Sequence, residues 1–128
     1  MTYTQNGQLN AFISAYITAM LWSTPGTTPD GEELESLEAL ELAPETVQRV
    51  VTECTGFYTT AFKVLSHLDE SGLHSFELSG HDFWLTRNGH GVGFWDRGLG
   101  NAGDYLTALS QQAGEQYPYI GDDNLIYI

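Results

Sequence analysis

The residues of this sequence that could carry chemistry gather between positions 80 and 98, in the stretch GHDFWLTRNGHGVGFWDRG. Two histidines and two aspartates lie there, at His81, Asp82, His90 and Asp96. A carboxylate beside an imidazole orients it as a general base, and both side chains are metal ligands. One interpretation is a small metal-assisted hydrolase with His81, Asp82 and Asp96 as catalytic residues, and the other is a structural hydrogen-bonded pair. The spacing matches no metal signature, so we predict no metal ion and no other cofactor.

The dipeptide Asn88-Gly89 determines how these side chains are expected to meet. Asn and Gly tolerate the positive φ angles of a two-residue turn, and strand-forming residues flank the pair on both sides. We therefore expect an antiparallel hairpin over residues 81–96, in which His81 faces Asp96. A four-residue turn would shift the partners by two and leave the faces unchanged. The face assigned to the sheet's core consists of Phe83, Leu85, Val92 and Phe94.

The second face of the predicted hairpin carries Trp84 and Trp95, together with two glycines that leave room for a ring to lie across the neighbouring strand. Two alternatives are open for these tryptophans. They form a flat aromatic platform that contacts a partner, or they lie in the core beneath a helix, since a tryptophan buries a large area.

The two arginines of this stretch, Arg87 and Arg97, are half of the basic residues in the chain. They either hold an anion or pair with nearby acids, for which Asp82, Asp96 and Asp104 are the candidates. The glycines after Asn88 superficially resemble a phosphate-binding loop. Such a loop needs a helix N-terminus after its glycines, whereas a strand is expected here, so nucleotide binding is not predicted.

Net charge is the strongest compositional feature of the chain, with 17 acidic residues against 4 basic ones and a net charge of −13. Nucleic-acid backbones are bound through Lys and Arg, so direct binding to nucleic acid is not expected and a charged partner should present a basic surface. The alternative is that the charge only maintains solubility. The acids expected to contact a partner are Glu32, Glu33, Glu35, Glu38, Asp122 and Asp123.

Length and cysteine content suggest the class of protein. A chain of 128 residues is typical of one domain, which we expect to span residues 1–128. Cys54 is the only cysteine, so no internal disulfide is possible, and a reducing cytoplasm is expected. The apolar run over residues 12–22 is too short to span a bilayer and follows no basic region, so neither a membrane anchor nor a signal peptide is predicted.

Three helices and a second hairpin complete the predicted fold. Apolar residues recur at helical spacing from Leu9 to Trp22 and again from Pro44 to Leu68, and a shorter helix is expected near residues 103–114. Residues 32–42 predict a short helical turn leading into an irregular segment. Residues 117–128 predict two strands around a turn at 121–124. The fold class is therefore α+β, with N-terminal helices packed on a small antiparallel sheet formed by the central hairpin and the C-terminal strands.

The segment HDFWLTRNGHGVGFWDRG, followed by LGNAGDYLTALSQQAGE and YIGDDNLIYI, is similar to a widespread group of small proteins encoded by phages and plasmids. The earlier pieces FISAYITAMLWS and LAPETVQRVVTECTGFY resemble that group too, so the resemblance covers nearly the whole chain. It carries over no catalytic residue, because the group has no established activity. What it implies is a setting, that of a phage or mobile-element accessory protein in the bacterial cytoplasm.

Two hypotheses follow, and the placement of the acids distinguishes them. In the first, the protein binds a basic surface of a host nucleic-acid-processing or defence protein, imitating phosphates with its carboxylates. In the second, it is a hydrolase centred on the hairpin. Acids of residues 32–53 and 122–123 sharing one surface would favour binding, and convergence of His81, Asp82 and Asp96 in a pocket would favour catalysis. A structural role in the virion is a third alternative.

Overall fold

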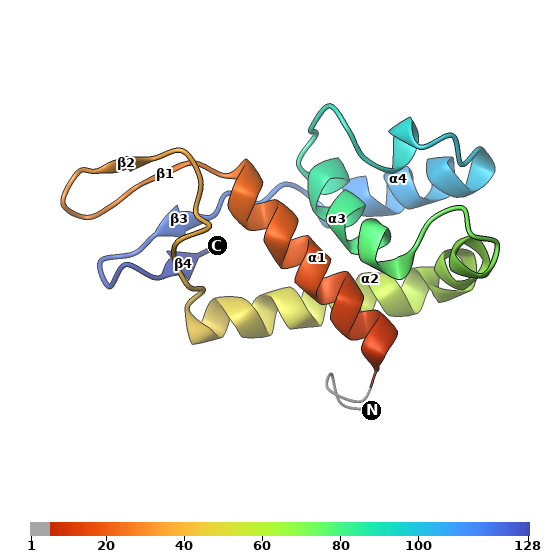
Figure 1. The fold of residues 1–128 in the computed structure, drawn as a ribbon, viewed down its shortest axis with the longest axis horizontal. Helices are drawn as coiled ribbons and strands as arrows, with labels where there is room; N and C mark the ends of the chain where they lie inside the picture. The colour runs from red at the N-terminus through yellow and green to blue at the C-terminus, as the bar shows by residue number, and fades with distance from the viewer. Residues whose placement is uncertain (1–5) are drawn as a thin grey trace.

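The computed structural model describes residues 6–128, and helices dominate this part of the chain (Figure 1). The helices are α1 (Gly7–Ser23), α2 (Pro44–Glu70), α3 (Phe76–Arg87), the 3₁₀ helix η2 (Phe94–Asp96) and α4 (Asn101–Ala113). The strands are β1 (Gly26–Thr27), β2 (Glu33–Leu34), β3 (Tyr119–Ile120) and β4 (Ile126–Tyr127). β1 pairs with β2 and β3 with β4, both antiparallel. The α+β class is confirmed, as are three of the expected helices and the C-terminal strands.

The predicted hairpin over residues 81–96 is wrong, because its first half is helix α3. The Asn88-Gly89 signal ends a helix here instead of turning a hairpin. Gly89 has φ +68°, and the backbone N–H groups of Gly89 and His90 donate to the carbonyls of Thr86 and Leu85. Helices commonly end at a glycine with a positive φ angle, where backbone N–H groups bond to the last carbonyl oxygens of the helix. The single sheet expected from the sequence does not form, and the strands of the described residues make two separate two-stranded sheets.

Helix α3 begins at a side-chain cap and is buried on nearly all sides. The Ser75 hydroxyl accepts a hydrogen bond from the Leu78 backbone N–H at 3.0 Å, which satisfies one of the free donors of the first turn. Phe83 and Leu85, assigned to one strand face, and Trp84, assigned to the other, are all buried in the helix. A helix enclosed all round lacks the polar stripe that marks an amphipathic helix. Within the expected core face, Val92 alone is exposed, at 42%.

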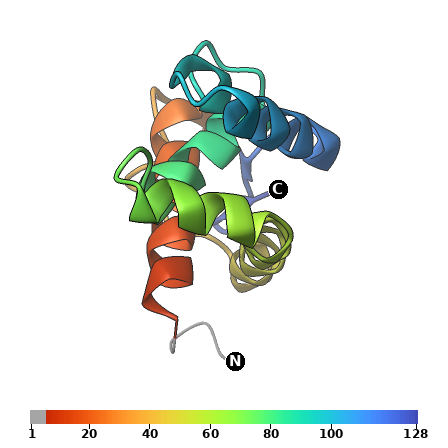
Figure 2. The same cartoon turned by 90° about the vertical axis from the view of Figure 1, so that its right-hand side faces the viewer.

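The core is an aromatic cluster around α3, which lies between α1 and α4 (Figure 2). Phe57 of α2 stacks on Phe83 with ring centroids 4.1 Å apart and on Phe94 with ring centroids 6.0 Å apart. α1 and α3 cross closely at Gly80, where a Cβ atom would lie 1.9 Å from the backbone oxygen of Phe12. This crossing sets the position of every side chain that α3 carries.

The two hairpins lie together at the end of the molecule that contains the start of α2 (Figure 1). Strand β1 contacts β3, and the Ile126 backbone bonds to Glu41 and Ala43 through its N–H and its carbonyl. Residues 32–42 were expected to form a helical turn leading into an irregular segment. The helical turn is wrong, because the segment begins with strand β2, and a hydrogen-bonded turn at residues 37–40 and irregular backbone follow. None of the helices in the described residues is long and apolar enough to cross a membrane.

Candidate functional site

The carboxylate of Asp82 is the centre of a first polar cluster, and its side chain is fully buried. Arg97 holds it in a two-pronged bond, with Nε 2.9 Å from Oδ2 and Nη2 2.8 Å from Oδ1. His74 Nε2 lies 3.0 Å from Oδ2, and His81 Nδ1 lies 3.4 Å from Oδ1. Asp82 thus joins α3 to the turn before it and to the loop after η2. The pairing of Arg97 with Asp82, one of the alternatives offered by the sequence, is confirmed.

Neighbouring donors compensate the negative charge of the buried Asp82 carboxylate. Burial by itself would raise the pKa of Asp82, but the hydrogen bonds from His74 and Arg97 and their charges lower it below the ordinary value of 3.8. The Asp82 bond in turn raises the pKa of Arg97. A carboxylate enclosed in this way is committed to holding the fold, since its oxygens already accept bonds from neighbouring segments.

The predicted catalytic set is brought together only in part. His81 contacts Asp82 at 3.4 Å, but Asp82 is buried and held by Arg97, and Asp96 is an exposed residue of η2. The His81 ring also lies near Trp22, with ring centroids 6.4 Å apart. Among the described residues, no group of three or more His, Cys, Asp or Glu side chains is arranged to hold a metal ion. The hairpin geometry on which the hydrolase hypothesis depended is therefore absent.

The expected aromatic platform of Trp84 and Trp95 does not form. Trp84 is 1% exposed, and its indole N–H donates to the Ser23 hydroxyl at 2.8 Å. Trp95 is on the surface, 54% exposed, in η2. The core alternative is right for Trp84, because the helical backbone turns this ring toward α1, where it meets the edge of Tyr16.

The acids expected to contact a partner all lie on the surface, and they share one end of the molecule (Figure 1). We call residues 30–45 together with residues 121–124 the acidic end. The exposed carboxylates of this acidic end belong to Asp30, Glu32, Glu33, Glu35, Glu38, Glu41, Glu45, Asp122 and Asp123. The contacts of β1 with β3 hold the two acidic segments side by side. The criterion set for binding included the acids of residues 32–53, and all of them except Glu53, which is bound to Arg87 elsewhere, lie at this end.

Basic side chains do little to offset the acidic end, because most of them are paired elsewhere. Arg97 is bound to Asp82, and Arg87 and Arg49 both contact Glu53, at 2.6 Å and 3.1 Å. The fourth base, Lys63, is exposed in the second half of α2. Since α2 begins at the acidic end, Lys63 is remote from it along the helix.

Two tyrosines on the C-terminal hairpin add an aromatic surface that the sequence analysis missed. Tyr119 and Tyr127 stack with ring centroids 5.8 Å apart, and Tyr119 is 55% exposed. The Tyr127 hydroxyl donates to Asp123 Oδ2 at 2.6 Å, which raises the pKa of Tyr127 to about 12. The two strands were predicted without a register, and the observed pairing of Tyr119 with Tyr127 places these rings opposite each other.

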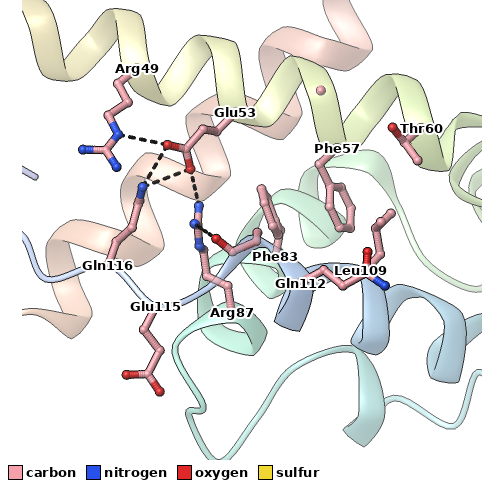
Figure 3. A pocket seen from close by; sticks show the side chains of 12 residues that line it. Arg49, Glu53, Phe57, Thr60, Phe83, Arg87, Leu109, Gln112, Glu115 and Gln116 are labelled. Atoms are coloured by element: carbon pink, nitrogen blue, oxygen red, sulfur yellow. Dashed lines mark hydrogen bonds and ion pairs between the residues drawn. The ribbon is translucent and has the colours of Figure 1, made fainter.

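A second polar cluster at Glu53 of α2 joins this helix to α3 and to the segment after α4 (Figure 3). The Glu53 carboxylate accepts bonds from Arg87 Nη1 at 2.6 Å, from Arg49 Nε at 3.1 Å, and from Gln116 Nε2 at 3.0 and 2.9 Å. Burial by itself would raise the pKa of Glu53, but the bond and charge of Arg87, with bonds from Arg49 and Gln116, lower it. Glu53 is therefore ionised and saturated with donors.

Arg87 closes the end of helix α4. Its Nε and Nη2 donate to the carbonyl oxygens of Gly114 and Ala113 at 2.7 and 2.8 Å, and its Nη1 also donates to the Tyr16 hydroxyl at 3.1 Å. A cation at a helix C-terminus interacts favourably with the helix dipole. Sequence reasoning missed this pairing because Glu53, Arg87 and Gln116 are far apart in the chain, and nothing local links them.

Beside this cluster, a cleft of about 390 Å³ opens between α2, α3 and α4 (Figure 3). Glu53, Arg87 and Arg49 line one part of it. The other part is less polar and is lined by Gly56, Phe57, Thr60, Phe83, Leu109, Gln112 and Ala113.

Comparisons of the chain with protein-family models, curated proteins and solved structures found no match. A function must therefore be argued from the surface, the cleft and the two polar clusters.

Proposed function

We propose that this protein is an accessory protein of a phage or mobile element that acts by binding a basic surface on a host nucleic-acid-processing or defence protein. The observation that carries the proposal is the acidic end, where nine exposed carboxylates from two segments of the chain lie together. A surface that binds nucleic acid is rich in Lys and Arg. Carboxylates grouped on one end can occupy such a surface in place of phosphates and so inhibit or redirect its owner.

The distribution of bases supports the same proposal. Complementary potentials steer encounter and select among partners, and both effects weaken when opposite charges are interspersed. Three of the four bases are paired with Glu53 or Asp82, so they do not intersperse the acidic end. The exposed ring of Tyr119, stacked on the half-buried ring of Tyr127, adds contact area of the kind enriched at interfaces.

The experiment is affinity capture of the tagged protein from host cells, followed by titration with the purified partner. The variant Glu32→Lys, Glu33→Lys, Glu35→Lys and Glu38→Lys should weaken binding at least about tenfold, because opposing charges now meet. Affinity of the wild type should fall as salt rises from about 0.05 to about 0.5 M, since the Debye length contracts.

A matched control carries the same change of charge elsewhere. Replacing the exposed acids Glu70, Glu77, Asp96 and Asp104 with Lys gives the same net charge of −5, since four reversals add eight units to −13. This control should bind much better than the acidic-end variant. Equal binding by the two variants would show that only net charge matters.

A second pair of substitutions tests the hydrolase alternative. His81→Asn and Asp96→Asn should leave partner binding intact, because neither residue belongs to the acidic end. Loss of activity in these variants, together with full binding by the acidic-end variant, would overturn the proposal in favour of catalysis.

A further inference from the structure

The cleft between α2, α3 and α4 has the dimensions of a ligand site and lies outside the acidic end. Its volume of about 390 Å³ falls in the range of small-molecule pockets, which combine apolar walls with a few polar groups. In Figure 3, Phe57 and Leu109 stand at one side of the cleft, and the Glu53 cluster stands at the other. The cleft therefore presents an apolar part and a charged part next to each other.

Gly56 is the feature of this cleft that packing does not explain. It lies in the interior of α2, a 27-residue helix, where glycine is among the poorest helix formers. Gly80 in α3 is required by the backbone of Phe12, whereas a Cβ atom at Gly56 would meet nothing within 4 Å. Because Gly56 lines the cleft, its missing side chain widens the apolar part.

The charged part of the cleft has one cation with hydrogen-bonding capacity to spare. Glu53 already accepts four bonds, and Arg87 is buried and donates four. Arg49 is different, because its side chain is 53% exposed and it uses Nε for Glu53 and Nη1 for the carbonyl of Ile128. Within the described residues, Arg49 Nη2 has no assigned acceptor.

The cleft is far less negative than the molecule as a whole, because its lining holds two bases and two acids while the chain carries a net charge of −13. Two of the four bases of the chain line it, at Arg49 and Arg87, and they are offset by Glu53 and by the C-terminal end of α4. Glu115 also lines the cleft, but Figure 3 shows its carboxylate pointing away from the other side chains. The ligand group best suited to the free edge of Arg49 is a carboxylate, which a guanidinium binds through parallel hydrogen bonds.

We propose that this cleft binds a small organic acid with a flat apolar body, placed so that the body covers Gly56 between Phe57 and Leu109 and the carboxylate meets Arg49. Arg49 and Gly56 are seven residues apart on one helix, about 10 Å along its axis, and the ligand would span the cleft between them. The site is independent of the acidic end and requires no partner protein.

The test uses three probes of one shape, namely 2-naphthoate, neutral 2-naphthamide and cationic 2-naphthylmethylammonium, titrated by calorimetry and by ¹H–¹⁵N spectra of the whole chain. Naphthoate should bind saturably and at least about tenfold more tightly than the other two, which is about 1.4 kcal/mol. A protein of charge −13 attracts cations non-specifically, so preference for the anion has to come from a local site. No saturable binding, or an equal or stronger response to the amide or the amine, would overturn the proposal.

Two variants and one control locate the site. Gly56→Leu fills the apolar part and should abolish naphthoate binding, whereas Gly7→Leu is a matched change in α1, at a glycine that also has nothing within 4 Å, and should bind normally. Arg49→Gln should remove the preference for naphthoate over naphthamide. Thermal unfolding checks that each variant is folded, and Gly56→Ala serves if the leucine variant is not. Naphthoate binding that survives in the folded Gly56 variant would show that the probe sits elsewhere.

Discussion

At the scale of single residues, the chain uses its few bases to neutralise one buried acid, Asp82, and one half-buried acid, Glu53. Asp82 and Glu53 are each surrounded by donors from segments distant in sequence, and each is held by an arginine. Breaking such a pair leaves an uncompensated charge, so these contacts matter more than surface ion pairs. The sequence predicted Asp82 as a catalytic residue because it follows His81 and because the expected hairpin paired its strand with the strand that carries Asp96. In the observed helix, the Asp82 carboxylate contacts His74 and Arg97.

The first prediction at this scale concerns acid denaturation. The folded state lowers the pKa of Asp82 and of Glu53 below their ordinary values of 3.8 and 4.5. Stability from a lowered acid pKa is fully present above the ordinary value and is lost as pH falls through the folded value. The free energy of unfolding should therefore decline as pH is lowered from about 5 toward 2, as urea titrations at each pH would measure.

Glu53→Gln provides the variant for this measurement. It should be less stable than the wild type at pH 7, because Arg87 is left buried without its carboxylate, and it should lose less stability on acidification. Glu70→Gln, at an exposed position of α2, is the control and should behave like the wild type. An acid response of Glu53→Gln equal to that of the wild type would contradict the assigned role of Glu53.

At the scale of elements, amphipathic segments were predictable and enclosed ones were not. α2 and α4 each have one apolar stripe, and α1 has a regular series of buried residues from Leu9 to Met20. Helix α3 is buried except at Glu77, Leu78 and His81, so neither strand alternation nor helical periodicity describes its apolar pattern. Its one local signal was the cap at Ser75. Strands of two residues, such as β1 and β2, are too short to show any period.

The prediction at the scale of elements concerns the crossing of α1 and α3. Gly80→Ala places a Cβ atom 1.9 Å from the backbone oxygen of Phe12, and a backbone atom cannot move away as a flexible side chain can. The helices must separate, which should cost about 1–3 kcal/mol or more in unfolding free energy. Gly56→Ala, a matched change in α2 with open space around it, should instead stabilise by up to about 1 kcal/mol. Urea midpoints of the two variants should lie on opposite sides of the wild type, and an unaffected Gly80→Ala would mean that α1 and α3 do not cross here.

At the scale of the whole molecule, the placement of charge was predictable and the placement of the cleft was not. Glutamates and aspartates interspersed with turn residues are expected on the surface, and the acidic end contains all six acids named as partner contacts. The cleft depends on Arg49, Gly56, Arg87 and Leu109, which come from three helices. These residues come together because of the path that α3 takes. The cleft could not be predicted once a hairpin was expected over residues 81–96.

The last prediction concerns the cost of grouping acids at one end. Like charges held close together repel, and salt screens them as the Debye length falls from about 10 Å at 0.1 M to about 3 Å at 1 M. The wild type should therefore become more stable as NaCl is raised over this range, as urea midpoints would show. Sodium chloride is the suitable salt, since sulfate also strengthens burial of apolar surface.

The two variants of net charge −5 separate clustering from total charge. The variant with lysines at Glu32, Glu33, Glu35 and Glu38 should lose most of the salt response, whereas the control variant keeps the acidic end and should retain more of it. Equal responses would show that the acids of the two segments do not repel at close range. Partner binding should respond to salt with the opposite sign, because screening weakens attraction between molecules while it relieves repulsion within one. A surface that is destabilising alone and favourable in a complex is what a binding role for the acidic end requires.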